Sequence, residues 1–116
     1  MKVIKSNSAQ HLPMEWGSLT WYASMELGNS EDLTVGKCVI KPNRSNPRHF
    51  HPNCSEILHV LQGKISHSYN DETVVMEEGD TISVPANIPH HAANLGETDA
   101  ILLISFSAAD RKTVGE

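Results

Sequence analysis

The chain has 116 residues, of which 39% are apolar, and a net charge of −5 at neutral pH. This length predicts one compact domain, residues 1–116, with a core of its own. Lys and Arg are scattered singly, which argues against a nucleic-acid partner, and no apolar stretch is long enough to span a membrane. Because the two cysteines form no disulfide pattern and the first residues do not resemble a signal peptide, we expect a cytoplasmic protein.

Short strands separated by turns are predicted along the chain. We expect strands at residues 18–27, 33–41, 56–62, 64–70, 73–76, 81–84, 90–95 and 99–106. No window shows a helical period, and Gly and Pro interrupt the chain at intervals typical of a sandwich or barrel. The pattern predicts an all-β fold of antiparallel strands with little or no helix. Within it we expect an N-terminal strand arm over about 1–30, a barrel over 31–107 and a short tail over 108–116.

Most of the seven histidines lie between residues 49 and 91, which suggests a metal site. His49 and His51 are two residues apart, so on a strand both imidazoles point to one face. A turn then leads to Glu56, which can deliver a carboxylate beside them. His90 follows a proline that favours extended backbone, and it is the candidate for a fourth ligand. Three imidazoles and one carboxylate suit one divalent transition metal ion, which could be Fe, Mn, Ni, Zn, Co or Cu, better than Ca or Mg.

These residues carry a resemblance to a known family. The run His49-Phe50-His51, with Glu56 after four residues and Gly63 after six more, resembles the first cupin motif. A second run is similar to the second cupin motif, and its spaced positions are Gly79, Pro85, His90 and Asn94. Asn87 stands where that motif has a glycine, and asparagine tolerates the left-handed turn that the position needs.

The resemblance is to small single-domain cupins of the conserved-barrel type, also described as RmlC-like jelly rolls. It implies a jelly-roll β-barrel of six to eight strands, open at one end, with the metal inside. It also implies the ligand set of the two motifs: His49, His51, Glu56 and His90.

Strand alternation assigns the side chains around Glu56 to two faces. If Glu56 points inward, then Leu58 and Val60 do so as well, and Ile57, His59 and Leu61 face outward. This outer face is too apolar for solvent, so it needs cover from the N-terminal strand or from a second copy of the chain. We predict a homodimer.

Two further side chains are candidates for catalysis. His67 and Tyr69 share one face of their strand and could act as a general acid or base if that face is inward, which the period leaves open. His91 alternates away from His90 and is not expected to bind metal. Arg44 and Arg48 flank the first motif and could clamp a carboxylate, although both could equally be solvated surface residues.

Four protein ligands leave one or two positions open on an ion that accepts five or six. We therefore expect a metal-dependent enzyme of the oxygenase, isomerase or lyase class that acts on a small organic or sugar-derived molecule in the barrel. The alternative is a non-catalytic small-molecule-binding or sensor module.

Overall fold

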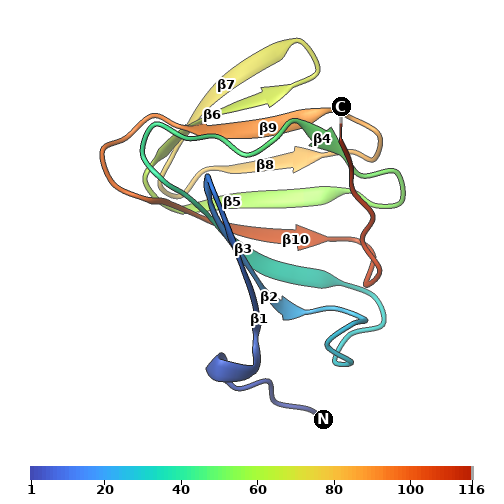
Figure 1. Cartoon of the computed structure of the whole chain (residues 1–116). Coiled ribbons are helices and arrows are strands. Elements are labelled where there is room, and N and C mark those ends of the chain that lie inside the picture. Colours follow the sequence, from blue (N-terminus) through green and yellow to red (C-terminus); the bar gives the residue numbers. More distant parts are fainter. Residues whose placement is uncertain (116) are drawn as a thin grey trace.

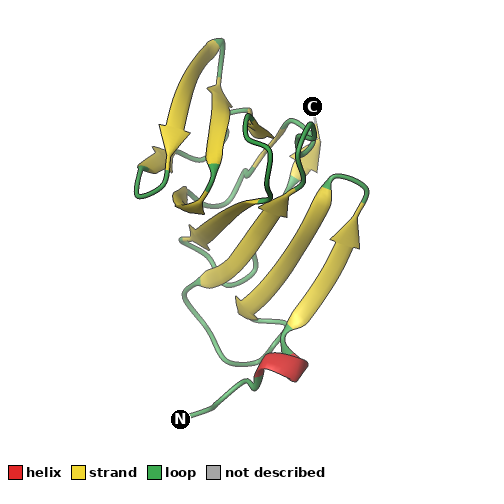
Figure 2. Ribbon diagram, turned by 90° about the vertical axis from the view of Figure 1, so that its left-hand side faces the viewer, coloured by secondary structure: helices red, strands yellow, loops and turns green. Residues whose placement is uncertain are grey.

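The fold consists almost entirely of strands, as Figures 1 and 2 show. The computed structural model describes residues 1–115, and within them it contains one 3₁₀ turn, Ser6–Ser8, and no α-helix. No helix in this part of the chain is long and apolar enough to cross a membrane. The strands are β1 (Gln10–Met14), β2 (Gly17–Ala23), β3 (Thr34–Ile40), β4 (His49–Phe50), β5 (Glu56–Gln62), β6 (Lys64–Tyr69), β7 (Glu72–Glu77), β8 (Thr81–Val84), β9 (His90–Asn94), β10 (Ala100–Phe106) and β11 (Val114–Gly115).

The strands form two antiparallel sheets. One has the order β1-β2-β3-β10-β5-β8, and the other has the order β11-β4-β9-β6-β7. The expected all-β, antiparallel jelly roll is confirmed. The expectation of six to eight strands was too low, because the strands β1, β4 and β11 add to the eight expected ones and extend the two sheets.

The core lies between the two sheets and follows the alternation of the strands. Burial alternates residue by residue along β3 and β10, with Ile40, Leu102 and Ile104 among the inward side chains. On β5 the inward residues are Glu56, Leu58 and Val60, whereas Ile57 and Leu61 are exposed. The predicted assignment of faces around Glu56 is therefore correct, and it places a carboxylate inside the barrel.

The N-terminal hairpin β1–β2 continues the six-stranded sheet through β3, and Figure 1 shows it below the barrel in blue. The expected strand over 18–27 ends at Ala23, and β1 was not predicted. β1 contains Pro13, which lacks a backbone N–H and argues against a central strand. It is tolerated because β1 is an edge strand that pairs with β2 alone.

The segment after β10, which was expected to be a short tail, folds back across the open end of the barrel. β11 pairs with β4, directly beside His49. The Asn53 side chain holds this segment at two points, because its Nδ2 donates to the carbonyl of Asp110 (3.1 Å) and its Oδ1 accepts from the N–H of Lys112 (3.0 Å). The tail is thus a fixed wall of the barrel interior.

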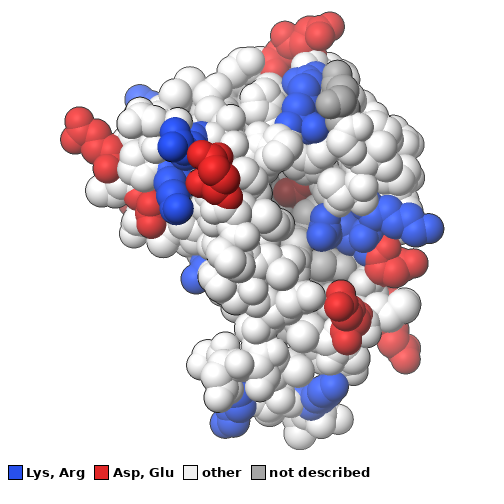
Figure 3. All heavy atoms as spheres, in the orientation of Figure 1, with Lys and Arg blue, Asp and Glu red and all other residues white. Residues whose placement is uncertain are grey.

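Charged side chains of both signs are interspersed on the face seen in Figure 3, and most of that face is uncharged. No single-sign patch dominates it. This agrees with the scattered Lys and Arg of the sequence.

Candidate metal centre

Four side chains that are distant in the sequence converge inside the barrel. We call them the donor cluster: His49, His51, Glu56 and His90. One ligand atom from each lies within 4.8 Å of the ligand atoms of the others. Three members are buried and His49 is partly exposed, so the cluster is closed on one side and open on the other. The structure thus brings together the four residues that the two motifs point to.

The three imidazoles are oriented by backbone carbonyls. The Nδ1 of His49 donates to the carbonyl of Pro47 (2.7 Å) and that of His90 to the carbonyl of Ile88 (2.8 Å), each two residues earlier in the chain. The Nδ1 of His51 donates to the carbonyl of Lys112 in the tail (2.9 Å). A hydrogen bond to a carbonyl requires a proton on Nδ1, which leaves Nε2 as the ligand atom when the ring is neutral.

The Nε2 atoms of two of these rings face the same carboxylate oxygen. Oε1 of Glu56 lies 3.0 Å from Nε2 of His90 and 3.3 Å from Nε2 of His51. Burial alone would raise the pKa of Glu56, but His51 and His90 outweigh it and lower that pKa to about 2. The site therefore holds a carboxylate against ring nitrogens that, in neutral rings, carry lone pairs.

Such an arrangement favours a bound cation. His51 Nε2 is buried and makes no hydrogen bond to any described residue, although it lies within ion-pair distance of Glu56. A buried nitrogen without a partner is costly, and a metal ion would satisfy it together with the carboxylate. The residues present therefore fit a divalent transition metal.

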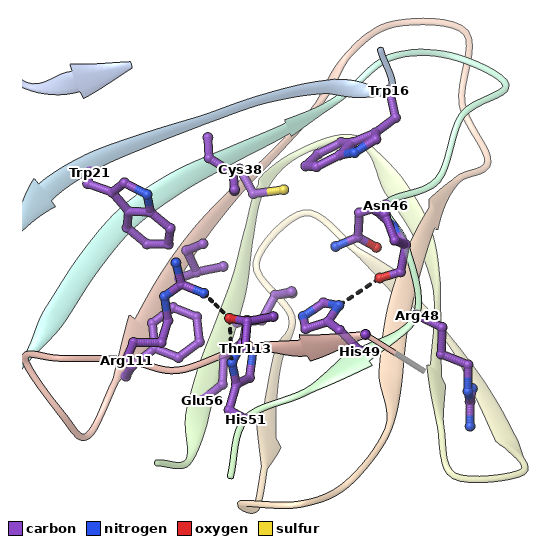
Figure 4. A pocket seen from close by; sticks show the side chains of 16 residues that line it. Trp16, Trp21, Cys38, Asn46, Arg48, His49, His51, Glu56, Arg111 and Thr113 are labelled. Atoms are coloured by element: carbon purple, nitrogen blue, oxygen red, sulfur yellow. Dashed lines mark hydrogen bonds and ion pairs between the residues drawn. The ribbon is translucent and has the colours of Figure 1, made fainter. Parts of the chain in front are cut away.

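A cavity of about 240 Å³ opens beside the donor cluster (Figure 4). Most of its wall is apolar and comes from both ends of the chain as well as from the barrel strands: Trp16, Leu19, Trp21, Leu58, Ile104 and Phe106. Cys38 also lines it. Burial raises the pKa of the Cys38 thiol to about 12, with Glu56 acting in the same direction, and Cys38 is not one of the four residues whose ligand atoms converge.

His67 lies on the inward face of β6, which the sequence could not decide. It is fully buried, its ring stacks on that of His90 with the ring centres 5.7 Å apart, and neither ring nitrogen hydrogen-bonds to a described residue. It does not line the 240 Å³ cavity. It packs against a member of the donor cluster, and the predicted acid or base role stays a prediction.

Tyr69 is placed elsewhere. It borders a separate hollow together with residues of β7 and β8, namely Glu72, Thr73, Val74, Ile82 and Ser83. The predicted acid or base role of Tyr69 stays a prediction. His59 and His91 point to the outside of their sheets, as expected, where they hydrogen-bond to Thr81 and Ser68 respectively.

The two arginines that were candidates for clamping a carboxylate contact other groups of the protein. Arg44 forms an exposed ion pair with Glu15 (2.9 Å). Arg48 borders the cavity, but its guanidinium donates to Ser68 (3.1 Å) and to the carbonyl of Asn70 (2.7 Å), and Figure 4 shows it turned away. Arg111, from the tail, also lines the cavity.

The sequence predicts only a short tail here, so it does not place Arg111 or the nearby Thr113 at the site. Arg111 donates a hydrogen bond to the Thr113 hydroxyl, which in turn lies 3.2 Å from Nδ1 of His51. The only signal in the sequence was the pair Thr113-Val114, which favours a strand but is too short to identify one.

The comparisons with known proteins agree with this geometry. The model of the cupin domain matches residues 36–106, which contain the whole donor cluster. The chain belongs to the cupin family.

Several relatives are plant proteins. A germin-like protein of Arabidopsis thaliana, subfamily 3 member 2, is 28% identical over 80 residues, which cover 65% of this cupin and 35% of the relative. Oxalate oxidase 1 of Hordeum vulgare is 25% identical over 88 residues, covering 69% and 44%. The cupin therefore spans less than half the length of either relative.

A solved structure of oxalate decarboxylase from Bacillus subtilis, whose title names Mn(II) centres, superposes with a TM-score of 0.85 at 21% identity. The match covers 91% of this cupin and 29% of that chain. At this identity the likeness shows a shared fold.

Proposed function

We propose that this cupin is a metal-dependent enzyme of the oxygenase, isomerase or lyase class, acting on a small organic molecule bound in the 240 Å³ cavity. The observation that carries the proposal is the position of the donor cluster. Three of its four members, His49, His51 and Glu56, line a cavity of about 240 Å³ instead of lying in a closed structural site.

Each part of the site has a role in this proposal. The carbonyls of Pro47, Ile88 and Lys112 hold the three imidazoles with Nε2 directed at one point. Glu56 supplies a negative charge that neutralises part of the charge of the cation. The apolar wall of the cavity excludes water. A divalent ion held there supplies a Lewis acid and open coordination positions. Manganese is the first candidate, because a similar fold has Mn(II) centres, followed by Fe, Ni, Zn, Co and Cu.

Metal analysis tests the site itself. Purified protein, stripped and then exposed to Mn, Fe or Zn, should hold about one ion per chain, the number that four converging ligands predict. The double variant His49→Ala/His51→Ala should lose that ion. The matched control is His59→Ala, because His59 lies on the outer face of β5. Stoichiometric metal in the double variant, or none in the wild type, would contradict the ligand assignment.

Turnover separates the enzyme from a sensor. Metal-loaded protein is incubated with small carboxylates, enols, thiols and sugar acids while oxygen uptake and products are followed. Oxalate belongs in the panel because one relative is an oxalate oxidase. Turnover that disappears when the metal is removed supports the enzyme. Tight binding of a panel member without any conversion would favour the non-catalytic module.

We also propose that the protein forms a homodimer through the outer face of the six-stranded sheet. Ile57 and Leu61 are 44% and 45% exposed there, and the neighbouring outward residues Ile101 and Leu103 on β10 are half-buried. The N-terminal hairpin extends the edge of this sheet, because β1 pairs with β2 and β2 pairs with β3. Light scattering should report two chains for the wild type and one for Ile57→Lys/Leu61→Lys. A monomeric wild type would refute this proposal.

A further inference from the structure

Arg111 occupies a fixed position in the wall of the cavity. Its guanidinium carbon lies 4.4 Å from the ring centre of Trp21 and 5.2 Å from that of Phe106. These two rings pack edge to face, with their centres 6.0 Å apart. Asn53 holds the backbone on both sides of Arg111, at Asp110 and Lys112. Cation–π contacts and this clamp therefore orient the guanidinium before any ligand arrives.

The charge of Arg111 has no counter-ion among residues 1–115. The guanidinium forms no ion pair there, and its one side-chain hydrogen bond goes to Thr113. Burial lowers the pKa of Arg111, while Glu56 and Cys54 act against this, yet arginine stays charged throughout the neutral range. Most of its five N–H donors thus remain for an anion, and a carboxylate is the planar anion that they match best.

Apart from a metal ion in the donor cluster, the described residues of the cavity wall offer a second carboxylate little positive charge to pair with. Apart from Arg111, the charged side chains in its wall are Glu56, which faces two histidines, and Arg48, which donates to Ser68 and Asn70. Two indole rings, a phenyl ring and aliphatic side chains make up most of the remaining surface. Oxalate has no apolar group that could pack against this apolar wall.

We propose that the cavity binds organic acids that carry one carboxylate on an apolar body, and that Arg111 recognises the carboxylate. The Thr113 hydroxyl lies between Arg111 and His51, so the acid is placed next to the donor cluster. This proposal deepens the proposed function and rests on it for the reaction. Arg111 is the residue that determines specificity, and Trp16, Trp21 and Phe106 hold the apolar body.

Binding of matched probes tests this assignment. Phenylacetate, its neutral amide phenylacetamide, and oxalate are titrated into Mn(II)-loaded and metal-free protein, and the fluorescence of Trp16 and Trp21 reports occupancy. In the wild type we expect phenylacetate to bind about tenfold or more tightly than phenylacetamide, as a charge-assisted pair predicts, and more tightly than oxalate. Arg111→Met should abolish the preference over the amide, and Arg111→Lys should retain part of it.

Arg44→Met is the matched control, because Arg44 is an exposed arginine paired with Glu15; it should behave like the wild type. A wild type that binds the amide as well as the acid overturns the proposal, as does Arg111→Met with the preference intact. If the preference for the acid is present with and without metal but is lost in Arg111→Met, the result supports recognition by Arg111. This conclusion holds even if the protein shows no turnover, so the binding proposal and the enzyme proposal can fail separately. A preference confined to the metal-loaded state and unchanged in Arg111→Met would assign recognition to the metal and refute the role of Arg111.

Discussion

The contacts of His90 in the donor cluster predict a proton that competes with the metal. Because Nδ1 of His90 donates to a carbonyl, the contact between its Nε2 and Glu56 requires a doubly protonated ring in the metal-free protein. Burial alone would lower the pKa of His90, but the hydrogen bond and the charge of Glu56 outweigh burial and raise it. The same nitrogen cannot hold both a proton and a metal ion.

Metal affinity should therefore increase with pH. Below the raised pKa of His90 the ion must displace a proton from Nε2, whereas above that pKa the nitrogen is free. Calorimetric titrations of Mn(II) in buffers of different ionisation enthalpy should show the release of about one proton at pH 6 and less at pH 8.5. Uptake without proton release at pH 6 would mean that His90 is already neutral there.

His67 is a buried imidazole without a partner among the described residues, and this has a consequence for stability. Burial lowers its pKa to about 4, and the charge of His90 acts in the same direction. The folded pKa is thus below the usual value near 6.5, so between pH 6.5 and 4 the unfolded chain binds more protons than the folded one. This contribution to stability is present above pH 6.5 and is lost as the pH falls toward 4.

The variant His67→Leu should therefore make the metal-free protein less sensitive to acid. We expect the melting temperature of the wild type to fall between pH 7 and pH 5, and the fall to be smaller in His67→Leu. At pH 7 the variant should be at least as stable, because it buries no unsatisfied nitrogen. His59→Leu on the outer face serves as the control. An equal fall in wild type and His67→Leu would contradict this account.

At the scale of elements, the packing of β2 against β3 sets the position of Trp21 in the cavity wall. Gly36 on β3 lies opposite Trp21 on β2, and a Cβ there would overlap the indole ring and lie 2.6 Å from the carbonyl oxygen of Thr20. The missing side chain lets the indole lie flat against the sheet, in contact with Arg111 and Phe106. Gly36 thus positions the aromatic wall of the cavity.

Gly36→Ala should displace this wall. Overpacking of this kind typically costs about 1–3 kcal/mol, and the shift of Trp21 should also weaken binding of phenylacetate. Gly115→Ala is the control for stability, since a Cβ at that position meets nothing within 4 Å. Chemical denaturation and the fluorescence titration measure the two effects. A Gly36→Ala variant with wild-type stability would show that Trp21 can move without cost.

The strands that carry the core could largely be predicted from the sequence, because their alternation is set by burial on one face, as in β3, β5 and β10. The elements that were missed have local signals that conflict with their structure. β1 contains a proline, and β11 has two residues. Their pairing is decided by contacts with strands that are distant in the chain.

At the scale of the whole molecule, the site is assembled from both ends of the chain. The convergence of the donor cluster could be predicted because two compact motifs contain its four members. The contacts that the tail makes with the site could not be predicted. The carbonyl of Lys112 and the side chain of Arg111 reach the site only after the tail folds back, and Asn53 holds the tail there. No periodicity in the sequence encodes that contact.

Loss of the Asn53 hydrogen bonds should loosen the contacts between the tail and the site. We expect Asn53→Ala to weaken metal binding by about tenfold, the lower end for changes behind a ligand histidine, and to weaken phenylacetate as well. Lys112→Ala is the control, because the group that binds His51 is a backbone carbonyl. A chelator competition assay measures the metal affinity. Equal affinities in both variants would show that the tail holds its place without Asn53.

The hydrogen bonds behind the three imidazoles also imply an order of events during folding. His49 and His90 find their carbonyls two residues away, so both rings can be oriented as soon as their own segments are extended. The ring of His51 is oriented by a carbonyl 61 residues further along the chain, so it is oriented only after the tail has docked. Contacts of such sequence separation form late, because a long loop must close first. In a refolding time course, tight metal capture should therefore lag behind the formation of the sheets and coincide with the arrival of the tail.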